Sequence, residues 1–180
     1  MQLQKKIRAA DIENYIAEVS VSSEALGKLY EAISPSVYAY ALTVTRNAND
    51  AMDVLHDCVV KVYEKAPYYQ ANGKPMAWII SIAKNLCYDK FRRQSRFCDM
   101  TEEQLEGYFA DNDAMSAEDR AVVRECLYRL DSDERTVVVL HAVSGLKHIE
   151  IAKLLQLPLS TVLSKYSRSI KKLKGILSEV

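Results

Sequence analysis

Turn-forming residues are scarce in this sequence. It has only 5 glycines and 4 prolines among 180 residues, and no segment alternates apolar and polar side chains as a half-buried strand does. Hydrophobic residues make up 49% of the chain, which is enough to build real cores. The sequence therefore predicts an all-α protein that is long enough for one domain or two small ones.

Long apolar runs and closely paired cysteines are also missing. No apolar run approaches the roughly 20 residues that span a bilayer, and the N-terminus lacks the apolar core of a signal peptide. Cys58, Cys87, Cys98 and Cys126 are far apart and form no C-x-x-C pair. We therefore expect a cytoplasmic protein with buried free thiols, without a metal site or a cofactor.

The chain has no excess of charge of either sign, because Lys+Arg and Asp+Glu both count 24. That balance alone argues against a nucleic-acid-binding protein, but the distribution of the charges argues for one. Residues 61–96 hold eight basic and two acidic residues, and residues 141–180 hold seven and two. Between them, residues 99–119 hold eight acidic residues and no basic one. The pattern suggests two DNA-contacting modules, joined by an acidic segment that is either a solvated tether or a mask for one of them.

The most informative stretch is 145–174, near the C-terminus. Apolar residues at helical spacing predict a short amphipathic helix over 146–155, which Pro158 separates from a second helix that Ser160 can cap. The apolar side of the second helix holds Val162, Tyr166, Ile170 and Leu173, and its other faces hold Thr161, Ser164, Lys165, Arg168, Lys171 and Lys172. Such a pair is typical of a helix-turn-helix whose second helix enters the DNA major groove; a surface helical hairpin with solvated lysines is the alternative.

Further helices are predicted upstream. Ser22 or Ser23 caps one that runs to about residue 33, and Pro35 restarts another. A helix over about 50–65 has five apolar residues on its inner side: Ala51, Val54, Leu55, Cys58 and Val62. Asp53 and Asp57 lie on its outer face, either as a solvated acidic surface or as a docking patch for a basic partner.

A loop over 67–75 leads into a basic helix over 76–96. One face of this helix holds Lys84, Asn85, Tyr88, Arg92 and Arg96. Aromatic rings beside cations suit single-stranded nucleic acid, but ordinary packing suits Trp78, and Tyr69 is either a stacking residue or an exposed loop aromatic. Capping-box sequences at 116–119 and 131–134 predict two more helices.

Three blocks, taken together and in this order, resemble a bacterial RNA polymerase sigma factor. The type is the small, two-domain extracytoplasmic-function (ECF) type of the sigma-70 family. The blocks are LYEAISPSVYAYALTVTRNANDAMDVLHDCVVKVYEKA, MAWIISIAKNLCYDKFRRQSR and LDSDERTVVVLHAVSGLKHIEIAKLLQLPLSTVLSKYSRSIKKLK. The resemblance covers about 26–96 and 121–177.

The resemblance implies roles by position. Asp53 and Asp57 would dock on the polymerase clamp helices, with His56 where the family usually has glutamine. The melted strand of the minus-ten element would meet Tyr69, Asn72, Lys84, Asn85, Arg92 and Arg93, of which Tyr69 and Asn85 form the pocket for a flipped base. The minus-thirty-five element would meet Ser160, Thr161, Ser164, Lys165 and Arg168. Three positions depart from the family pattern and affect promoter specificity: Leu163 for a basic residue, Gln156 for glycine and Lys147 for a serine or threonine cap.

The layout expected on this basis has four parts. Residues 1–21 form an N-terminal extension, 22–97 a core-docking and promoter-melting domain, 98–115 an acidic linker, and 116–180 a helix-turn-helix domain. The protein would be a transcription initiation factor without a catalytic site, and its partners would be core RNA polymerase and promoter DNA, with an anti-sigma factor as a further candidate. A helix-turn-helix regulator with a helical sensor or dimerisation domain, or a helical adaptor without DNA binding, is the alternative.

Overall fold

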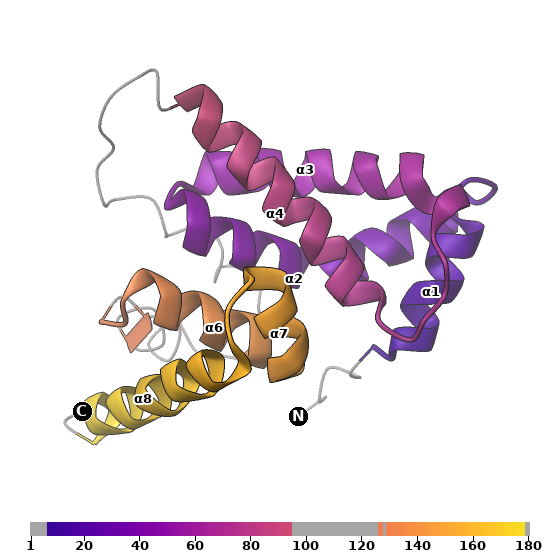
Figure 1. Cartoon of the computed structure of the whole chain (residues 1–180). Helices are drawn as coiled ribbons and strands as arrows, with labels where there is room; N and C mark the ends of the chain where they lie inside the picture. The colour runs from indigo at the N-terminus through magenta and orange to yellow at the C-terminus, as the bar shows by residue number, and fades with distance from the viewer. Residues whose placement is uncertain (1–6, 95–125, 128, 179–180) are drawn as a thin grey trace.

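The computed structural model of the chain describes residues 7–94, 126, 127 and 129–178. Within these residues it contains seven α-helices, one 3-10 helix and no strand, as the sequence predicts (Figure 1). The elements, labelled as in Figure 1, are α1 (Ala9–Glu18), α2 (Ser23–Thr45), α3 (Ala48–Lys65), η1 (Ala66–Tyr68), α4 (Pro75–Gln94), α6 (Ser132–Ala142), α7 (His148–Leu155) and α8 (Leu159–Leu177). We call α1–α4 the N-terminal half and α6–α8 the C-terminal half.

The N-terminal half packs around one apolar core with α2 at its centre. α2 contacts α1, α3 and α4, and its Leu29 and Ile33 have no exposed surface. The five residues of α3 that the sequence predicts to be inward are all buried: Ala51, Val54, Leu55, Cys58 and Val62. Burial of such side chains stabilises each helix more than its intrinsic propensity does.

Helix α1 is part of this core. Its Ile12 and Ile16 are buried, as is Val19 just beyond its end, and the helix contacts both α2 and α4. The weak helical periodicity of the first twenty residues therefore becomes a packed helix through tertiary contacts. Its position fixes the polar side of α1 beside the loop that precedes α4 (Figure 1).

Helix α2 runs without a break through Pro35, where the sequence predicts a restart. Proline removes one N–H from the helix and its ring crowds the carbonyl four residues earlier, so an interruption is the usual result. Here Ile33 and Val37 are both fully buried on either side of it, and Pro35 itself lies on the exposed side. Burial on the inner side therefore holds the helix together across the proline.

Side chains cap the starts of α2, α3 and α6, and the caps of α2 and α6 are predicted from the sequence. The side chains of Ser22, Asn47 and Asp131 each accept a hydrogen bond from the amide three residues later, at 3.2, 2.9 and 2.8 Å. This confirms Ser22, rather than Ser23, as the cap of α2. Ser160 is not a cap: α8 begins at Leu159 after Pro158, so Ser160 already lies inside the helix.

The C-terminal half forms the predicted helix-turn-helix from α7 and α8, with α6 packed against both. Gly145, in the turn between α6 and α7, has a φ of 68°. Gln156, the residue that ends α7, has a φ of 57°. The left-handed conformation that the family usually gives to glycine is therefore adopted by a glutamine, which costs about 1 kcal/mol. Lys147 precedes α7 without a side-chain cap, but its own N–H donates to the Glu150 carboxylate at 2.9 Å.

The two halves lie against each other, α6 beside α2 and α7 beside α4 (Figure 1). The Ser36 hydroxyl of α2 donates to the Val143 carbonyl at 3.3 Å. Lys84 of α4 donates to the carbonyl of Leu154 at 2.5 Å, and Lys74, just before α4, pairs with Glu150 at 3.6 Å.

Three of the four cysteines are buried free thiols, as expected: Cys58, Cys87 and Cys126. Burial raises the pKa of both Cys58 and Cys87 to about 12, so these thiols stay protonated and unreactive. Cys98, the acidic segment 99–119 and most of the helix predicted from 116 lie outside the described residues.

Candidate nucleic-acid and polymerase interface

The outer face of α3 presents Asp53 and Asp57, which are both exposed. Asp53 is already engaged: its carboxylate pairs with Lys90 of α4 at 2.7 Å, and the same ammonium binds Asp50 at 2.7 Å. A basic partner at Asp53 therefore competes with Lys90, whereas the sequence alone suggests two equivalent carboxylates. The Asp53 side chain is 66% exposed beside a Lys90 that is 22% exposed, so a basic partner can reach Asp53 from solvent, and docking there stays a prediction.

The loop before α4 holds Tyr69 in a defined place. Its ring packs against Trp78, with 4.6 Å between the ring centroids, and its hydroxyl donates to Glu13 at 2.9 Å. Burial, together with the bond to Glu13, raises the Tyr69 pKa to about 12. Tyr69 is therefore half-buried and held by two contacts, and its role as a stacking residue stays a prediction.

Asn72 and Lys74 join this loop to the helix that follows. The Asn72 side-chain oxygen accepts the Lys74 amide at 3.0 Å, and Lys74 provides the first carbonyl of α4, which accepts from the Trp78 amide. Gly73 between them has φ of 72°, a left-handed conformation that suits glycine. The loop and the start of α4 therefore form one structural unit.

Helix α4 carries the other predicted melting residues. Asn85, Tyr88 and Arg92 are exposed, and the backbone of Arg93 is helical while its side chain lies outside the described residues. Lys84 is only half exposed, with its ammonium 5.7 Å from the Tyr88 ring centroid. The bond from Lys84 to Leu154 places one predicted phosphate contact at the junction of the halves.

The structure does not bring Tyr69 and Asn85 together at one point. Tyr69 packs at Trp78, and Asn85 follows Trp78 by seven residues, which is two helical turns or about 10 Å on nearly the same face. A strand lying along α4 can contact both, with different nucleotides or with opposite ends of one flipped nucleotide.

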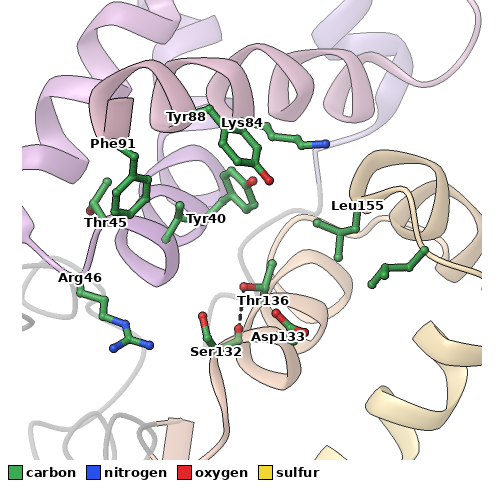
Figure 2. Close-up of a pocket in the computed structure, with 12 residues that line it drawn as sticks. Tyr40, Thr45, Arg46, Lys84, Tyr88, Phe91, Ser132, Asp133, Thr136 and Leu155 are labelled. Atoms are coloured by element: carbon green, nitrogen blue, oxygen red, sulfur yellow. Dashed lines mark hydrogen bonds between the residues drawn. The ribbon is translucent and has the colours of Figure 1, made fainter. Parts of the chain in front are cut away.

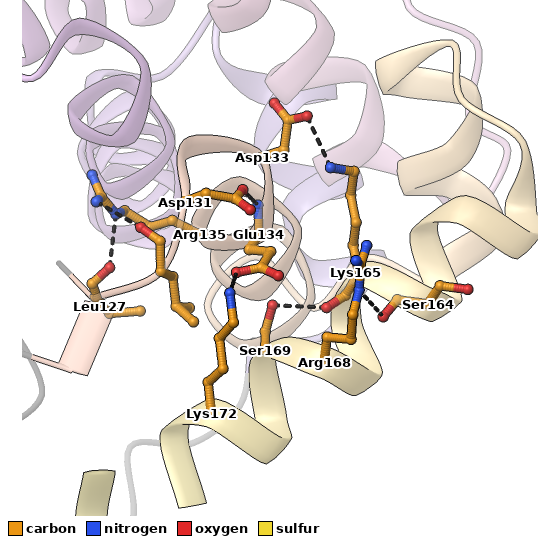
Figure 3. Close-up of polar contacts among 11 residues, drawn as sticks. Leu127, Asp131, Asp133, Glu134, Arg135, Ser164, Lys165, Arg168, Ser169 and Lys172 are labelled. Carbon is orange, nitrogen blue, oxygen red and sulfur yellow. Dashed lines mark hydrogen bonds and ion pairs between the residues drawn. The ribbon is translucent and has the colours of Figure 1, made fainter. Parts of the chain in front are cut away.

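On α8, the predicted recognition residues differ in exposure, and Figure 3 shows the polar contacts of Ser164, Lys165 and Arg168. Ser160, Ser164 and Arg168 are exposed, and Thr161 is half-buried. The Lys165 side chain is only 17% exposed and binds Asp133 of α6 at 3.0 Å. Arg168 has the more accessible cation, so it is the better placed of the two to contact a base.

An ion pair between a buried carboxylate and a half-exposed ammonium, which the sequence does not predict, joins α8 to α6. The Glu134 side chain is 3% exposed and accepts from Lys172 at 2.6 Å (Figure 3). Glu134 occupies the final position of a capping-box sequence, where a carboxylate normally turns back to the helix end. Its real partner is 38 residues away, and helical spacing alone carries no signal for it.

A cavity of about 560 Å³ lies between the two halves (Figure 2). Its N-terminal side is formed by α2 and α4, and its C-terminal side by α6 and the end of α7. The lining includes Tyr40, Lys84, Tyr88, Phe91, Thr136 and Leu155. Lys84, one of the predicted melting residues, and Tyr88, on the same helix, therefore border the junction of the halves.

These features define an all-helical DNA-binding protein with a helix-turn-helix and a separate aromatic and basic face. Comparisons with known proteins identify the family to which it belongs. Residues 29–97 match the family description Sigma-70 region 2, and residues 120–173 match Sigma-70, region 4. The ECF RNA polymerase sigma factor SigK of Mycobacterium ulcerans (strain Agy99) is 25% identical over 179 residues, 94% of this chain and 95% of that protein. SigK of Mycobacterium sp. (strain KMS) is 26% identical over 162 residues, 86% and 83% of the two chains.

Solved structures share the fold. The sigma factor RpoE from Bartonella quintana, in complex with the anti-sigma factor NepR, matches with a TM-score of 0.64 and 20% identity over 84% of this chain and 96% of that one. CnrH, in complex with the cytosolic domain of CnrY, matches with a TM-score of 0.60 and 24% identity over 95% and 98%.

The chain belongs to the sigma-70 family and is a sigma factor of the ECF type. Its function is transcription initiation with RNA polymerase at promoter DNA. In the part of the chain that the structure describes, every helix is too short or too polar to cross a membrane.

Proposed function

We propose that three surfaces divide this function. The α3 face with Asp53 and Asp57 docks on core polymerase. The melted minus-ten strand is held by the loop before α4 and by α4 itself, through Tyr69, Asn72, Lys84, Asn85, Arg92 and Arg93. The minus-thirty-five duplex is recognised by α8, through Ser160, Thr161, Ser164, Lys165 and Arg168. The observation that carries the proposal is the row along α4. The row begins with Tyr69, which packs on Trp78, and continues two helical turns after Trp78 with the exposed Asn85. It ends with the exposed Tyr88 and Arg92. Along α4 these side chains offer aromatic rings for stacking, an amide for a base edge and a positive charge for a phosphate.

Both DNA elements are engaged at once only if the halves separate. The minus-ten and minus-thirty-five elements are, by these positions, about 25 base pairs apart. This corresponds to about 85 Å of duplex at 3.4 Å per base pair. A compact chain of this length has a radius of gyration of only about 16 Å. Extended, residues 98–115 reach about 60 Å, so this segment serves as the tether between domains 22–97 and 116–180.

The arrangement with the halves in contact is the free form of the protein in this proposal. Lys84 and Lys74 then contact groups of α7, and a phosphate would have to displace these contacts. An anti-sigma factor that fills the cavity between the halves would stabilise the same arrangement. The shared fold with RpoE, solved with its anti-sigma factor NepR, supports the proposal of such a partner.

The chain contributes binding free energy and no catalysis, because the polymerase carries out phosphodiester chemistry. We infer that it acts in the cytoplasm, where core polymerase and the chromosome meet.

Reconstituted transcription tests the division of roles. Core polymerase is combined with the parent chain, with Asp53→Lys/Asp57→Lys, or with the control Glu24→Lys/Glu31→Lys, and a genomic promoter library is transcribed. The control reverses two exposed carboxylates of α2. We expect the α3 variant to lose core binding at fixed salt while its helical circular dichroism is unchanged. Equal loss in both variants would make the effect one of net charge and would remove α3 as the docking face.

A further inference from the structure

The carboxylate of Glu13 receives three hydrogen bonds from the loop that precedes α4. The Tyr69 hydroxyl donates to Glu13 Oε1 at 2.9 Å, the Asn72 amide at 3.0 Å and the Gly73 amide at 2.8 Å. The donors are 56 to 60 residues away in the chain. One oxygen from α1 thus meets a side chain and two consecutive backbone amides of a single loop.

These bonds fix the parts of the loop that the melted strand would meet. Tyr69 is held at both ends, by Trp78 at its ring and by Glu13 at its hydroxyl. The amides of Asn72 and Gly73 face Glu13, and this leaves the Asn72 side chain to accept from Lys74 at the start of α4. Bonds to a charged acceptor are about twice as strong as neutral ones, so a single carboxylate can order this short segment.

Helix α1 has anchors other than Glu13. Ile12 and Ile16 are buried in the core and hold the helix through apolar contacts. Glu13 also lies before residues 29–97, the part of the N-terminal half that matches region 2. Its effect on the loop can therefore be removed without removing the helix.

We propose that Glu13 is a positioning residue for promoter opening, which holds the 69–74 loop in the shape that presents Tyr69 and Asn72 to the melted strand. The inference rests on the proposed role of this loop and adds a residue from outside the matched family regions. It differs from a second possibility with the same contacts, in which the carboxylate occupies an anion site that a DNA phosphate must take over. The first mechanism makes loss of Glu13 harmful to opening, and the second makes it beneficial.

The test compares full-length Glu13→Ala and Glu13→Gln with a matched control, Glu18→Ala, which removes an exposed carboxylate from the same helix. Amide hydrogen exchange at Asn72 and Gly73 measures the loop directly, and the emission of Trp78, the only tryptophan in the chain, reports on its contact with Tyr69. Holoenzymes made with each variant are then assayed by permanganate footprinting on native and premelted promoters, together with core binding.

We expect Glu13→Ala to speed exchange at both amides roughly tenfold and to slow opening of native promoters by roughly threefold to tenfold. Core binding should be unchanged, and premelted promoters should show a smaller defect. Glu13→Gln keeps an acceptor oxygen and should restore most of the loop and most of the opening rate. In a Tyr69→Ala background the Glu13→Ala change should have little further effect, because both act through one loop.

Three results overturn the inference. If Glu13→Ala loses amide protection but opens promoters at the parent rate, the contact is structural only and the pocket can stand. If opening becomes faster, the carboxylate blocks an anion site instead of positioning the loop. If Tyr69→Ala itself opens native promoters at the parent rate, the proposed role of the loop is wrong, and the inference falls with it.

Discussion

At the scale of single residues, Tyr69 is the side chain of the proposed melting site that is held at two points. Its ring lies 4.6 Å from that of Trp78 and its hydroxyl binds Glu13, so in the proposed role it would meet a flipped base from a fixed position. Base–aromatic stacking is worth about 1–3 kcal/mol. We predict that Tyr69→Ala impairs opening of native promoters while core binding and upstream duplex binding stay near the parent values. Tyr69→Phe keeps the ring and loses only the hydroxyl, so it should retain most of the opening that permanganate footprinting detects.

Asn85 should behave differently from Tyr69. It lies on α4, two turns beyond the Trp78 that Tyr69 packs against, and its side chain offers both a donor and an acceptor. We predict that Asn85→Ala relaxes the preference for one base of the non-template strand and changes opening of the best promoter only slightly. The measurement is a set of premelted promoters that differ at single minus-ten positions. A uniform loss at every position would show that Asn85 contacts backbone and not base.

Arg168 and Lys165 lie close together on α8, but their surroundings separate their roles. Arg168 is exposed, whereas Lys165 is bound to Asp133. If Arg168 forks onto a guanine, Arg168→Ala costs about 1–3 kcal/mol at one base pair of the upstream element. Lys165→Ala should instead weaken all sequences alike and reduce the salt dependence by about one phosphate contact. Duplex binding to single-base variants at several salt concentrations distinguishes the two; the same pattern for both residues would contradict the division.

At the scale of helices, the three elements of the C-terminal half meet at an aromatic cluster. His141 of α6 stacks on His148 of α7 with centroids 4.3 Å apart, and Tyr166 of α8 packs edge-on against both. The His148 Nε2 is buried and has no hydrogen-bond partner among the described residues. Burial first, and the neighbouring His141 second, hold the pKa of His148 below its usual value. A proton on His148 is therefore unfavourable in the folded state.

This cluster predicts a direction for the pH dependence of stability. Because the folded His148 binds its proton less readily than the unfolded one, its contribution is fully present above the unfolded pKa of about 6.5 and is lost as the pH falls below it. His148→Phe keeps the ring stack and removes the titration, so its stability should fall less between pH 7 and pH 5 in urea unfolding. His56 is exposed on α3, and His56→Ala serves as the control that removes a histidine outside the cluster. Equal slopes for parent and His148→Phe would contradict this account.

The helices themselves are largely predictable from the sequence, for reasons that are local. Apolar spacing identifies the inward side of α3, and Ser22 and Asp131 mark helix starts through side-chain hydrogen bonds that depend on one residue type. The errors occur where tertiary packing outweighs a local rule. Buried Ile33 and Val37 carry α2 through Pro35, and α8 begins before Ser160. Family similarity supplies the site residues, which periodicity alone leaves open.

At the scale of the whole molecule, the contacts that matter most join distant segments. Glu13 meets the loop 56 residues later, and Ser36 meets Val143 across 107 residues. Neither contact has a sequence signal, because helical spacing says which side of a helix is inward and not which outward residues meet. For the same reason, the sequence predicts two DNA-binding modules but leaves open that Lys84 of one is held by α7 of the other.

The junction of the halves can be opened without touching a DNA-facing residue. Ser36 is buried where α2 meets α6, and it donates to the Val143 carbonyl. Arginine at this position is too large for the junction, so we predict that Ser36→Arg separates the halves and frees Lys84 and Lys74. The radius of gyration measured by small-angle X-ray scattering should rise, and the free protein should bind minus-ten single strands several-fold more tightly. Ser23→Arg adds the same charge at an exposed position of the same helix and should leave both quantities unchanged. A more expanded Ser36→Arg protein with parent-like strand affinity would show that the contact of the halves does not limit access to Lys84 and the other predicted melting residues.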